Sequence, residues 1–288
     1  GIGHAKGSAG ADSQYGLFDQ VAAAMNDFNL LVERVVTACR EVGREEVMPR
    51  YLKVAHQRKV DGSLLTEADL AAQVALFKRL QAIAPYPVLG EEMTDAEQRD
   101  VWGMGGDGFW CVDPIDGTSN FVNGLPFFAI SVALVRNGKS VLGVVYDPSA
   151  DEAFYAVEGQ GAYMNGERLP LKAPPDELSR CMAGIELKRI DRTLAGRLAF
   201  EHPFSSQRNL GASTLDWCYI AAGRMHIYLH GGQKLWDYAA GCLILKEAGG
   251  AACALNGADF QSDDPWCRSV LAALTPDLLA QWKAWVGV

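Results

Sequence analysis

A series of four short segments in the middle of the chain, each rich in β-branched and aromatic residues, restricts the possible folds most strongly. They are residues 109–112, 129–135, 141–146 and 152–157. Turn-forming sequences lie between and after them, including Asn137-Gly138, Asp147-Pro148 and a glycine-rich loop at 159–161. Short strands connected in this way are typical of neighbours that run antiparallel. The sequence therefore predicts an antiparallel meander at the centre of the protein.

Helical patterns precede the meander. Between residues 17 and 42, apolar side chains recur every three or four positions, which is the spacing of one helical face, and Gly43 follows. A second helix is predicted from Thr66 to Pro85, with Thr66 and Asp69 in the positions of an N-terminal cap. Two helices therefore precede the sheet.

Strand-like and helix-like segments alternate after about Arg168. The strands are predicted at 182–185 and 226–229, and the helices at 210–222, 236–248 and from Thr275-Pro276 onward. Alternation of this kind is typical of a layered α/β arrangement. We therefore expect an α+β protein of two packed halves, 17–167 and 168–288, after a flexible tail or cloning remnant at 1–16.

Composition excludes several classes of protein. The 288 residues include 26 Lys and Arg against 35 Asp and Glu, a formal net charge of −9, which disfavours direct binding of nucleic acid. No segment approaches the ~18 consecutive apolar residues of a membrane span. The seven cysteines are scattered without a CxxC motif, so neither a disulfide framework nor a zinc site is expected. These features predict a soluble cytoplasmic protein.

Two further patterns resemble known binding motifs but occur in the wrong context. The glycines between Gly103 and Gly108 match G-x-G-x-x-G, yet they precede a predicted strand instead of connecting a strand to a helix, so we interpret them as a loop. His226 and His230 are four residues apart, as zinc ligands on a helix would be. The segment between them is strand-like, so a zinc pair is not expected.

The acidic residues at three places in the chain are more informative. Asp113 and Asp116 end an apolar strand, Glu91 follows a short apolar run, and Asp237 is near the start of an apolar helix. Simpler explanations exist at each place, because Asp-Pro and Asp-Gly form turns, the adjacent Glu92 could be a solvated loop charge, and Asp caps helices. The other possibility is that the carboxylates of Glu91, Asp113, Asp116 and Asp237 lie close together in the folded protein.

Converging carboxylates repel one another unless protons or cations compensate their charge. Their donors are all oxygens, which favours a hard divalent ion such as Mg²⁺ over zinc or copper. The carbonyl of Ile115, in the turn next to Pro114, is a further candidate oxygen ligand. Bound ions would also supply the positive charge that an anionic substrate requires.

These motifs together make the sequence similar to the inositol monophosphatase family, whose members are Mg²⁺-dependent, lithium-sensitive phosphatases. The matching segments are Gly90-Glu91-Glu92, Asp113-Pro-Ile-Asp-Gly-Thr-Ser-Asn-Phe121, Leu125-Pro-Phe-Phe-Ala-Ile-Ser131, Trp236-Asp-Tyr-Ala-Ala-Gly241 and Glu247-Ala-Gly-Gly250. They occur in family order, and the similarity extends from about Lys59 to Leu274. The resemblance implies a layered α-β-α-β-α sandwich of two halves.

The resemblance also implies roles for individual residues. Two or three Mg²⁺ ions would be held by Glu91, Asp113, the Ile115 carbonyl, Asp116 and Asp237, with Asp113 bridging two of them. Thr118 and Asp69 would orient an attacking water, in a mechanism that also uses Glu91. Asp69 could instead serve only as a cap. The backbone amides of Gly117 and Thr118 would bind phosphate oxygens during in-line displacement.

The substrate is less well defined by the resemblance. The acidic residue that recognises inositol in the family, seven positions before Asp237, is His230 in this chain. A carboxylate accepts hydrogen bonds from neighbouring hydroxyls, whereas a neutral histidine has one donor and one acceptor. Gly211, Ala212 and Ser213 match another substrate-binding loop of the family. Strict specificity for inositol is therefore not expected.

The sequence thus predicts a phosphomonoesterase acting on a small polyol or sugar phosphate, with inositol 1-phosphate as the default. Histidinol phosphate, fructose 1,6-bisphosphate and 3′-phosphoadenosine 5′-phosphate are alternative substrates. A regulatory binding protein is an alternative of another class, because some bacterial members of the family act in RNA-associated complexes. The resemblance further implies a homodimer and inhibition by lithium.

Overall fold

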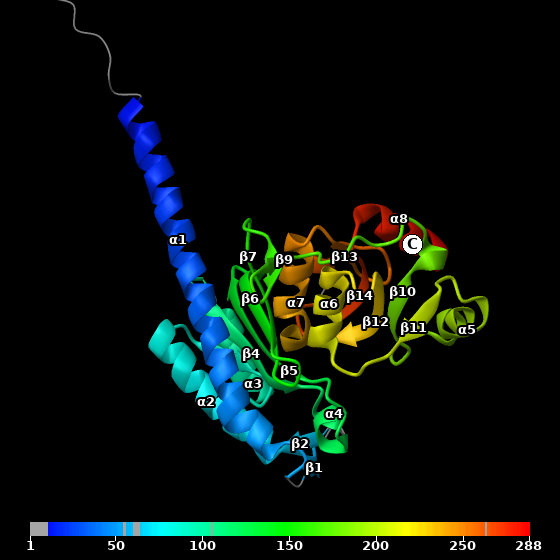
Figure 1. The fold of residues 1–288 in the computed structure, drawn as a ribbon, viewed down its shortest axis with the longest axis horizontal. Coiled ribbons are helices and arrows are strands. Elements are labelled where there is room, and N and C mark those ends of the chain that lie inside the picture. The colour runs from blue at the N-terminus through cyan, green and yellow to red at the C-terminus, as the bar shows by residue number, and fades with distance from the viewer. Residues whose placement is uncertain (1–10, 54–55, 60–63, 105, 263) are drawn as a thin grey trace, which may run out of the picture.

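The computed structural model describes residues 11–288, apart from residues 54–55, 60–63, 105 and 263. Three layers of helices alternate with two sheets (Figure 1), which confirms the predicted α+β sandwich. In order, the helical layers are α1 (Ala11–Val42) with α2 (Glu67–Ile83), α6 (Ser213–Ala222) with α7 (Leu235–Glu247), and α5 (Arg192–Glu201) with α8 (Pro276–Val286).

The first sheet has seven strands in the order β3-β4-β5-β6-β7-β8-β9. Their bounds are Val88–Gly90, Phe109–Asp116, Ala129–Arg136, Lys139–Asp147, Glu152–Val157, Ala162–Met164 and Glu167–Arg168. Only the β3–β4 pair of this sheet is parallel, and every later pair is antiparallel. The meander predicted from the sequence is therefore confirmed as β4 to β7.

The second sheet has five strands in the order β11-β10-β12-β14-β13. In that order, their bounds are Ser206–Arg208, Met182–Glu186, Ile227–Gln233, Arg268–Ala273 and Ala251–Cys253. β11, β10 and β12 are mutually parallel, whereas β14 is antiparallel to both of its neighbours. This mixed sheet corresponds to the alternating strands and helices predicted after Arg168.

Three hydrophobic cores hold the five layers together. One lies between the first sheet and α1 with α2, one surrounds α6 and α7 between the two sheets, and one lies between the second sheet and α5 with α8. Each contains one fully buried tryptophan, which is Trp110 below α1 and α2, Trp217 between the two sheets, and Trp282 under α8. Burial of such large side chains holds neighbouring layers together. This packing fixes the relative positions of the helix and strand ends at which the acidic residues lie.

Several element boundaries differ from the sequence prediction. α1 begins at Ala11, six residues before the predicted start, while residues 1–10 of the predicted tail lie outside the described part of the chain. α3 (Asp95–Gly103) was not predicted, because it buries only Gln98 and Val101 and so has little apolar periodicity. α5, also not predicted, similarly buries only two of its residues. The short hairpin of β1 (His56–Arg58) and β2 (Leu64–Thr66) precedes α2.

The glycine motif lies between the end of α3 and the start of β4, although Gly105 itself is outside the described residues. The order of elements is thus helix, loop, strand, which is the reverse of a dinucleotide-binding motif. No helix in the described part of the chain is both long and apolar enough to cross a membrane. All seven cysteines are free.

Candidate active site

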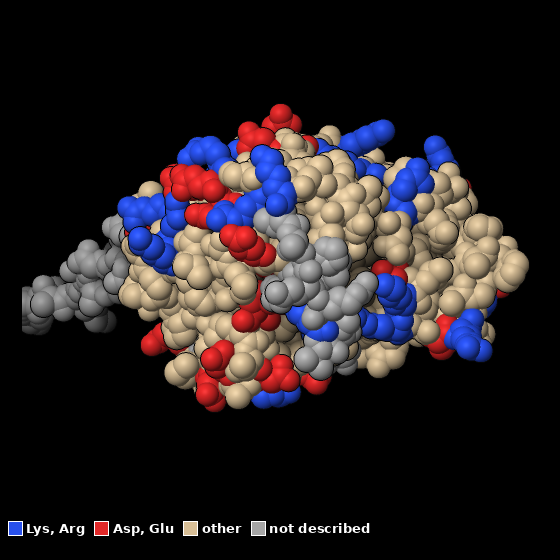
Figure 2. Space-filling model, turned by 90° about the horizontal axis from the view of Figure 1, so that it is seen from below, with Lys and Arg blue, Asp and Glu red and all other residues tan. Residues whose placement is uncertain are grey.

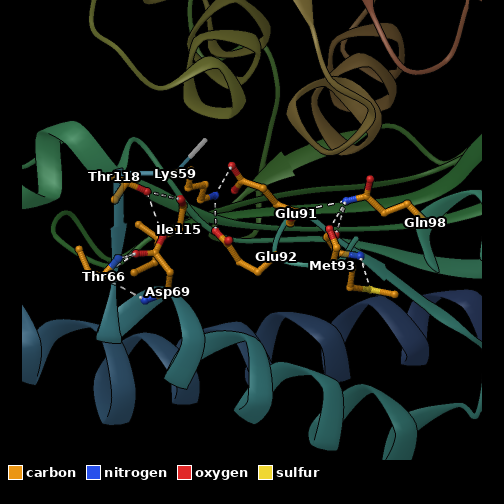
Figure 3. Close-up of polar contacts among 10 residues, drawn as sticks. Lys59, Thr66, Asp69, Glu91, Glu92, Met93, Gln98, Ile115 and Thr118 are labelled. Carbon is orange, nitrogen blue, oxygen red and sulfur yellow. Dashed lines mark hydrogen bonds and ion pairs between the residues drawn. The ribbon is translucent and has the colours of Figure 1, made fainter. Parts of the chain in front are cut away.

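The parallel pairing of β3 and β4 brings Glu91 beside Asp113. Gly90 pairs with Val112, and the next residue in each strand continues in the same direction. The Glu91 amide donates to the Val112 carbonyl at 3.2 Å. Gln98 of α3 fixes the turn after β3, because its side-chain amide donates to the Gly90 carbonyl at 2.9 Å and reaches the carbonyl of Glu91 (Figure 3).

A bulge in β4 determines the direction of Asp113 and Asp116. Residues three apart in a regular strand point to opposite faces of the sheet. Here Asp113 pairs with Ser131 and Asp116 with Ala129, so β4 has one residue more than β5 in this interval. The extra residue offsets the alternation. Both carboxylates can therefore point to the same side.

Asp237 joins them from the first turn of α7. Carboxylate oxygens of Asp113, Asp116 and Asp237 lie within 4.8 Å of one another. The Lys234 amide donates to Asp237 Oδ2 at 2.9 Å, so the same carboxylate also caps the helix. Within the described residues, this is the one group of three or more side chains arranged to hold a metal ion.

Burial disfavours the ionised form of these carboxyl groups. It is the largest cause of the raised pKa of Asp113, Asp116 and Asp237, and it raises the pKa of Glu91 to about 7. The neighbouring charges of Glu91 and Asp116 raise the pKa of Asp113 further, because like charges at short range repel each other. A cation in the same place would compensate for this repulsion.

The oxygen atoms present fit a divalent metal ion. Asp113 is only 2% exposed, and its Oδ1 atom is buried without a hydrogen-bond partner. Buried polar atoms nearly always have a partner in folded proteins. An unpaired carboxylate oxygen inside the acidic cluster of Glu91, Asp113, Asp116 and Asp237 therefore indicates a bound ligand. Carboxylate and carbonyl oxygens suit a hard ion. The acidic cluster can therefore bind a metal.

Asp69 connects α2 to the turn after β4. Its Oδ2 atom accepts hydrogen bonds from the amide and hydroxyl of Thr66, at 2.8 and 2.6 Å. Its Oδ1 atom accepts from the Thr118 hydroxyl at 3.0 Å, and this hydroxyl also lies 3.2 Å from the Ile115 carbonyl (Figure 3). Asp69 is fully buried. The cap and the contact with Thr118 therefore coexist in one side chain.

The start of α6 brings the second half of the chain to the same place. The Thr214 amide and hydroxyl donate to Asp116 Oδ2 at 2.8 and 2.7 Å. In the loop before it, Gly211 lies against the Asn120 side chain, and Ala212 lies close to Gly117. Gly117 has a φ of 84°, in the region where glycine is favoured. The loop 211–213 therefore packs directly on the turn that carries Asp116.

The structure shows the surroundings of the two histidines that are four residues apart. The Nδ1 atom of His226 accepts a hydrogen bond from the Met182 amide at 2.9 Å. His230 lies in β12, where it pairs with Glu186 of β10.

Lys59 and Thr214 contact the acidic cluster but were not identified from the sequence. Lys59 Nζ lies 2.8 Å from a Glu92 oxygen and 3.5 Å from a Glu91 oxygen (Figure 3). Neither residue belongs to a local acidic motif, and each is brought in by folding from a distant segment. For Thr214, the only sequence signal was its position in a Ser-Thr pair near the start of a predicted helix. For Lys59, the sequence contained no signal.

Comparison with known proteins identifies the family of this chain. Residues 30–284 match the model of the inositol monophosphatase family. An inositol-1-monophosphatase of Mesorhizobium japonicum is 35% identical over 242 residues, covering 82% of this chain and 88% of the relative. The Nus factor SuhB of Pasteurella multocida is 37% identical over 205 residues, covering 69% and 74% respectively.

Solved structures of inositol monophosphatases and SuhB proteins are also similar to this chain. The extragenic suppressor protein suhB of Bartonella henselae has a TM-score of 0.76 and 29% identity, covering 89% of this chain and 98% of that one. Staphylococcal SaIMPase-II with inositol monophosphate bound has a TM-score of 0.67 and 28% identity, covering 85% and 89%. This chain therefore belongs to the inositol monophosphatase family, a metal-dependent family of phosphoric monoester hydrolases.

Proposed function

We propose that this protein is a Mg²⁺-dependent phosphomonoesterase for small polyol phosphates, with inositol 1-phosphate as the first candidate. The observation that carries the proposal is the unpaired, buried Asp113 oxygen among carboxyl groups that all resist ionisation. Glu91, Asp113, Asp116, Asp237 and the Ile115 carbonyl would hold two or three ions. When bound, these ions would supply the positive charge that activates water and neutralises the phosphate.

The protein's own contribution is a fixed hydrogen-bond relay next to this cluster. Because Thr118 donates to Asp69 Oδ1, the hydroxyl oxygen of Thr118 can accept a hydrogen bond from a water molecule. Asp69 cannot rotate freely, since its other oxygen is held by Thr66. A water on Thr118 would therefore be oriented toward one face of the phosphate, as in-line attack requires. The amides at 117–118 are candidates for binding the phosphate itself.

Inositol 1-phosphate is favoured among the candidate substrates by the relatives. The Mesorhizobium relative is an inositol-1-monophosphatase, and SaIMPase-II has been solved with inositol monophosphate bound. Histidinol phosphate, fructose 1,6-bisphosphate and 3′-phosphoadenosine 5′-phosphate remain alternatives with the same reaction. A homodimer, lithium inhibition and a cytoplasmic location stay predictions from the family resemblance.

A second candidate function is suggested by the Pasteurella relative, which is a Nus factor. In this reading the chain acts as a regulatory partner in an RNA-associated complex. Direct contact with RNA is disfavoured by the net charge of −9. On the face seen in Figure 2, acidic and basic side chains are interspersed over the described residues without a continuous basic stripe. Catalysis and a regulatory role can be separated by assay.

The test is phosphate release from the four candidate monoesters, with Mg²⁺ and with a chelator. We expect Mg²⁺-dependent turnover of at least one substrate, and Asp116→Asn should lower it by roughly 100-fold or more because a metal ligand is lost. Asp100→Asn, an exposed substitution in α3, is the matched control and should retain activity. Absence of Mg²⁺-dependent release from every substrate would refute the phosphatase proposal.

A further inference from the structure

A bulge near the end of β12 brings two buried polar side chains to the same face of the second sheet. Tyr228 and Gln233 are five residues apart, so in a regular strand they would point to opposite faces. Between His230 and Gln233, β12 advances by three residues while its partner β14 advances by only two, so β12 contains one extra residue. This residue offsets the alternation of side chains. Gln233 therefore lies beside Tyr228, and the two side chains hydrogen-bond each other at 3.0 Å.

Four side chains of α6 and β12 form one chain of hydrogen bonds. The Trp217 indole donates to Gln233 Oε1 at 2.9 Å. Gln233 Nε2 donates to the Tyr228 hydroxyl at 3.0 Å, and this hydroxyl donates to Asp216 Oδ2 at 3.0 Å. An indole can only donate, so the amide of Gln233 must direct its oxygen to Trp217 and its nitrogen to Tyr228. The chain of bonds therefore has a single direction, from Trp217 to Asp216.

Burial makes this chain of hydrogen bonds act as a unit. Trp217 and Gln233 are fully buried, and Tyr228 and Asp216 are nearly so. A buried donor or acceptor that loses its partner costs more free energy than an ordinary hydrogen bond contributes. Removal of one group would leave its neighbours unpaired inside the protein. The start of α6 and the end of β12 are therefore held in one relative position.

The α6 end of this network is connected to Asp116. Asp216 and Trp217 lie in the first turns of α6. Thr214, in the same part of the helix, donates its amide and hydroxyl to Asp116 Oδ2 at 2.8 and 2.7 Å. These residues of α6 lie within about one helical turn, so they move together. A displacement of the start of α6 would therefore displace the groups that hold Asp116.

The β12 end of the network is connected to Asp237. Gln233 is the last residue of β12, and Lys234 directly after it is the N-cap of α7. The Lys234 amide donates to Asp237 Oδ2 at 2.9 Å. One peptide bond thus separates Gln233 from the amide that orients this carboxylate. The position of Asp237 therefore depends on the position of Gln233.

We propose that Gln233 and Tyr228 are positioning residues that hold the carboxylates of Asp116 and Asp237 at the separation required by a shared divalent ion. Oxygen atoms of these two carboxylates and of Asp113 lie within 4.8 Å of one another. The inference rests on the metal site of the proposed function and adds two residues that do not themselves bind the ion. Residues that orient metal ligands commonly change metal affinity by roughly 10- to 100-fold when they are replaced.

The test measures the Kd for Mg²⁺ by isothermal titration calorimetry, so it does not depend on turnover. Circular dichroism confirms that each variant is folded at the temperature of the titration. Tyr228→Phe keeps the ring and removes the hydroxyl, which leaves Gln233 Nε2 and Asp216 Oδ2 without this partner. We expect the Kd to rise by roughly tenfold. Gln233→Leu breaks two bonds and should raise the Kd at least as much. If Gln233→Leu does not fold, Tyr228→Phe decides the test.

Tyr146→Phe is the matched control. It also removes the hydroxyl of a buried tyrosine that donates to an aspartate, here to Asp151 Oδ1 at 2.8 Å. Tyr146 packs in the core between the first sheet and α1, whereas α6 and α7 belong to the core between the two sheets. The control should leave the Kd for Mg²⁺ within about twofold of the wild-type value, because its contacts are not shared with the metal site.

An unchanged Kd in the folded Tyr228→Phe variant would overturn the proposal. An equal rise in Tyr146→Phe would overturn it too, because a general loss of stability would then explain both results. A wild type that binds no Mg²⁺ would refute both the positioning role and the metal-dependent function. A wild type that binds Mg²⁺ but hydrolyses no monoester would refute the phosphatase function alone, and the Kd values of the variants would still decide the positioning role.

Discussion

Asp69 shows how a single side chain can serve both folding and chemistry. One of its carboxylate oxygens caps α2 through Thr66, and the other holds the Thr118 hydroxyl beside Ile115. Burial raises the pKa of Asp69, although the hydrogen bonds from Thr66 and Thr118 oppose this effect. The two roles differ in what they require, because an amide can replace a carboxylate in a cap but not as a base or charged acceptor.

The chain contains a second capping box that separates these roles. Thr94 and Glu97 cap α3 with the same reciprocal hydrogen bonds, but both side chains are exposed. Asp69→Asn and Glu97→Gln should each change the free energy of unfolding by about 1 kcal/mol or less. Only Asp69→Asn should lower kcat, by roughly 10²- to 10⁴-fold. Chemical denaturation and steady-state kinetics of both variants check this. Full activity of the Asp69→Asn variant would show that Asp69 serves only as a helix cap.

At the level of elements, the acidic cluster depends on how closely α7 packs on its neighbours. Asp237 lies at one end of α7, and Gly241 lies one turn further on, against Trp217 of α6. A Cβ atom at position 241 would overlap the Cβ of Trp217, which is fully buried. The glycine is therefore required by the close approach of two helices. The position of Asp237 follows from that packing.

Two helical glycines provide a direct comparison. Gly241→Ala should lower the free energy of unfolding by about 1–3 kcal/mol, because the core cannot accept the extra methyl group. Gly196→Ala in α5 should raise it by about 0.5–1 kcal/mol, since a Cβ there meets no atom within 4 Å and alanine favours a helix. Urea denaturation of both variants measures the difference. A stabilising Gly241→Ala would contradict the tight α6–α7 contact.

The elements also show what the sequence could and could not predict. Strands β4 to β7 and helices α2, α7 and α8 were predictable because each has a local periodicity or cap. Asp113 and Asp116 were predictable from one motif, but the bulge that points them the same way depends on pairing with β5. Thr214 and Lys59 reach the site only through tertiary contacts between distant segments.

For the whole molecule, the site combines carboxylates from segments that are far apart in the sequence. Asp113 and Asp116 lie in β4 and Glu91 directly follows β3, whereas Asp237 lies in α7. A cation between them would link these segments directly. Because burial makes ionisation of these groups unfavourable, the stability of the fold should depend on both pH and metal.

The direction of the pH effect follows from the raised pKa values. Below the ordinary pKa of 4.5, Glu91 is protonated in both the folded and the unfolded protein. Between 4.5 and about 7, the folded state holds a proton that the unfolded state has released. Stability therefore falls as the pH rises through this window, and Asp113, Asp116 and Asp237 act in the same direction. Above this pH window, where the carboxylates are ionised, bound Mg²⁺ should compensate for the loss of stability.

The most direct test of a divalent-cation site at this cluster is the melting temperature at pH 5 and pH 8, with Mg²⁺ and with a chelator. With the chelator, the wild type should melt at a lower temperature at pH 8 than at pH 5. Saturating Mg²⁺ should raise the melting temperature at pH 8 by about 5–10 °C and have little effect at pH 5. Asp113→Asn should respond much less to Mg²⁺. A wild type whose melting temperature at pH 8 is the same with and without Mg²⁺ would contradict the central claim.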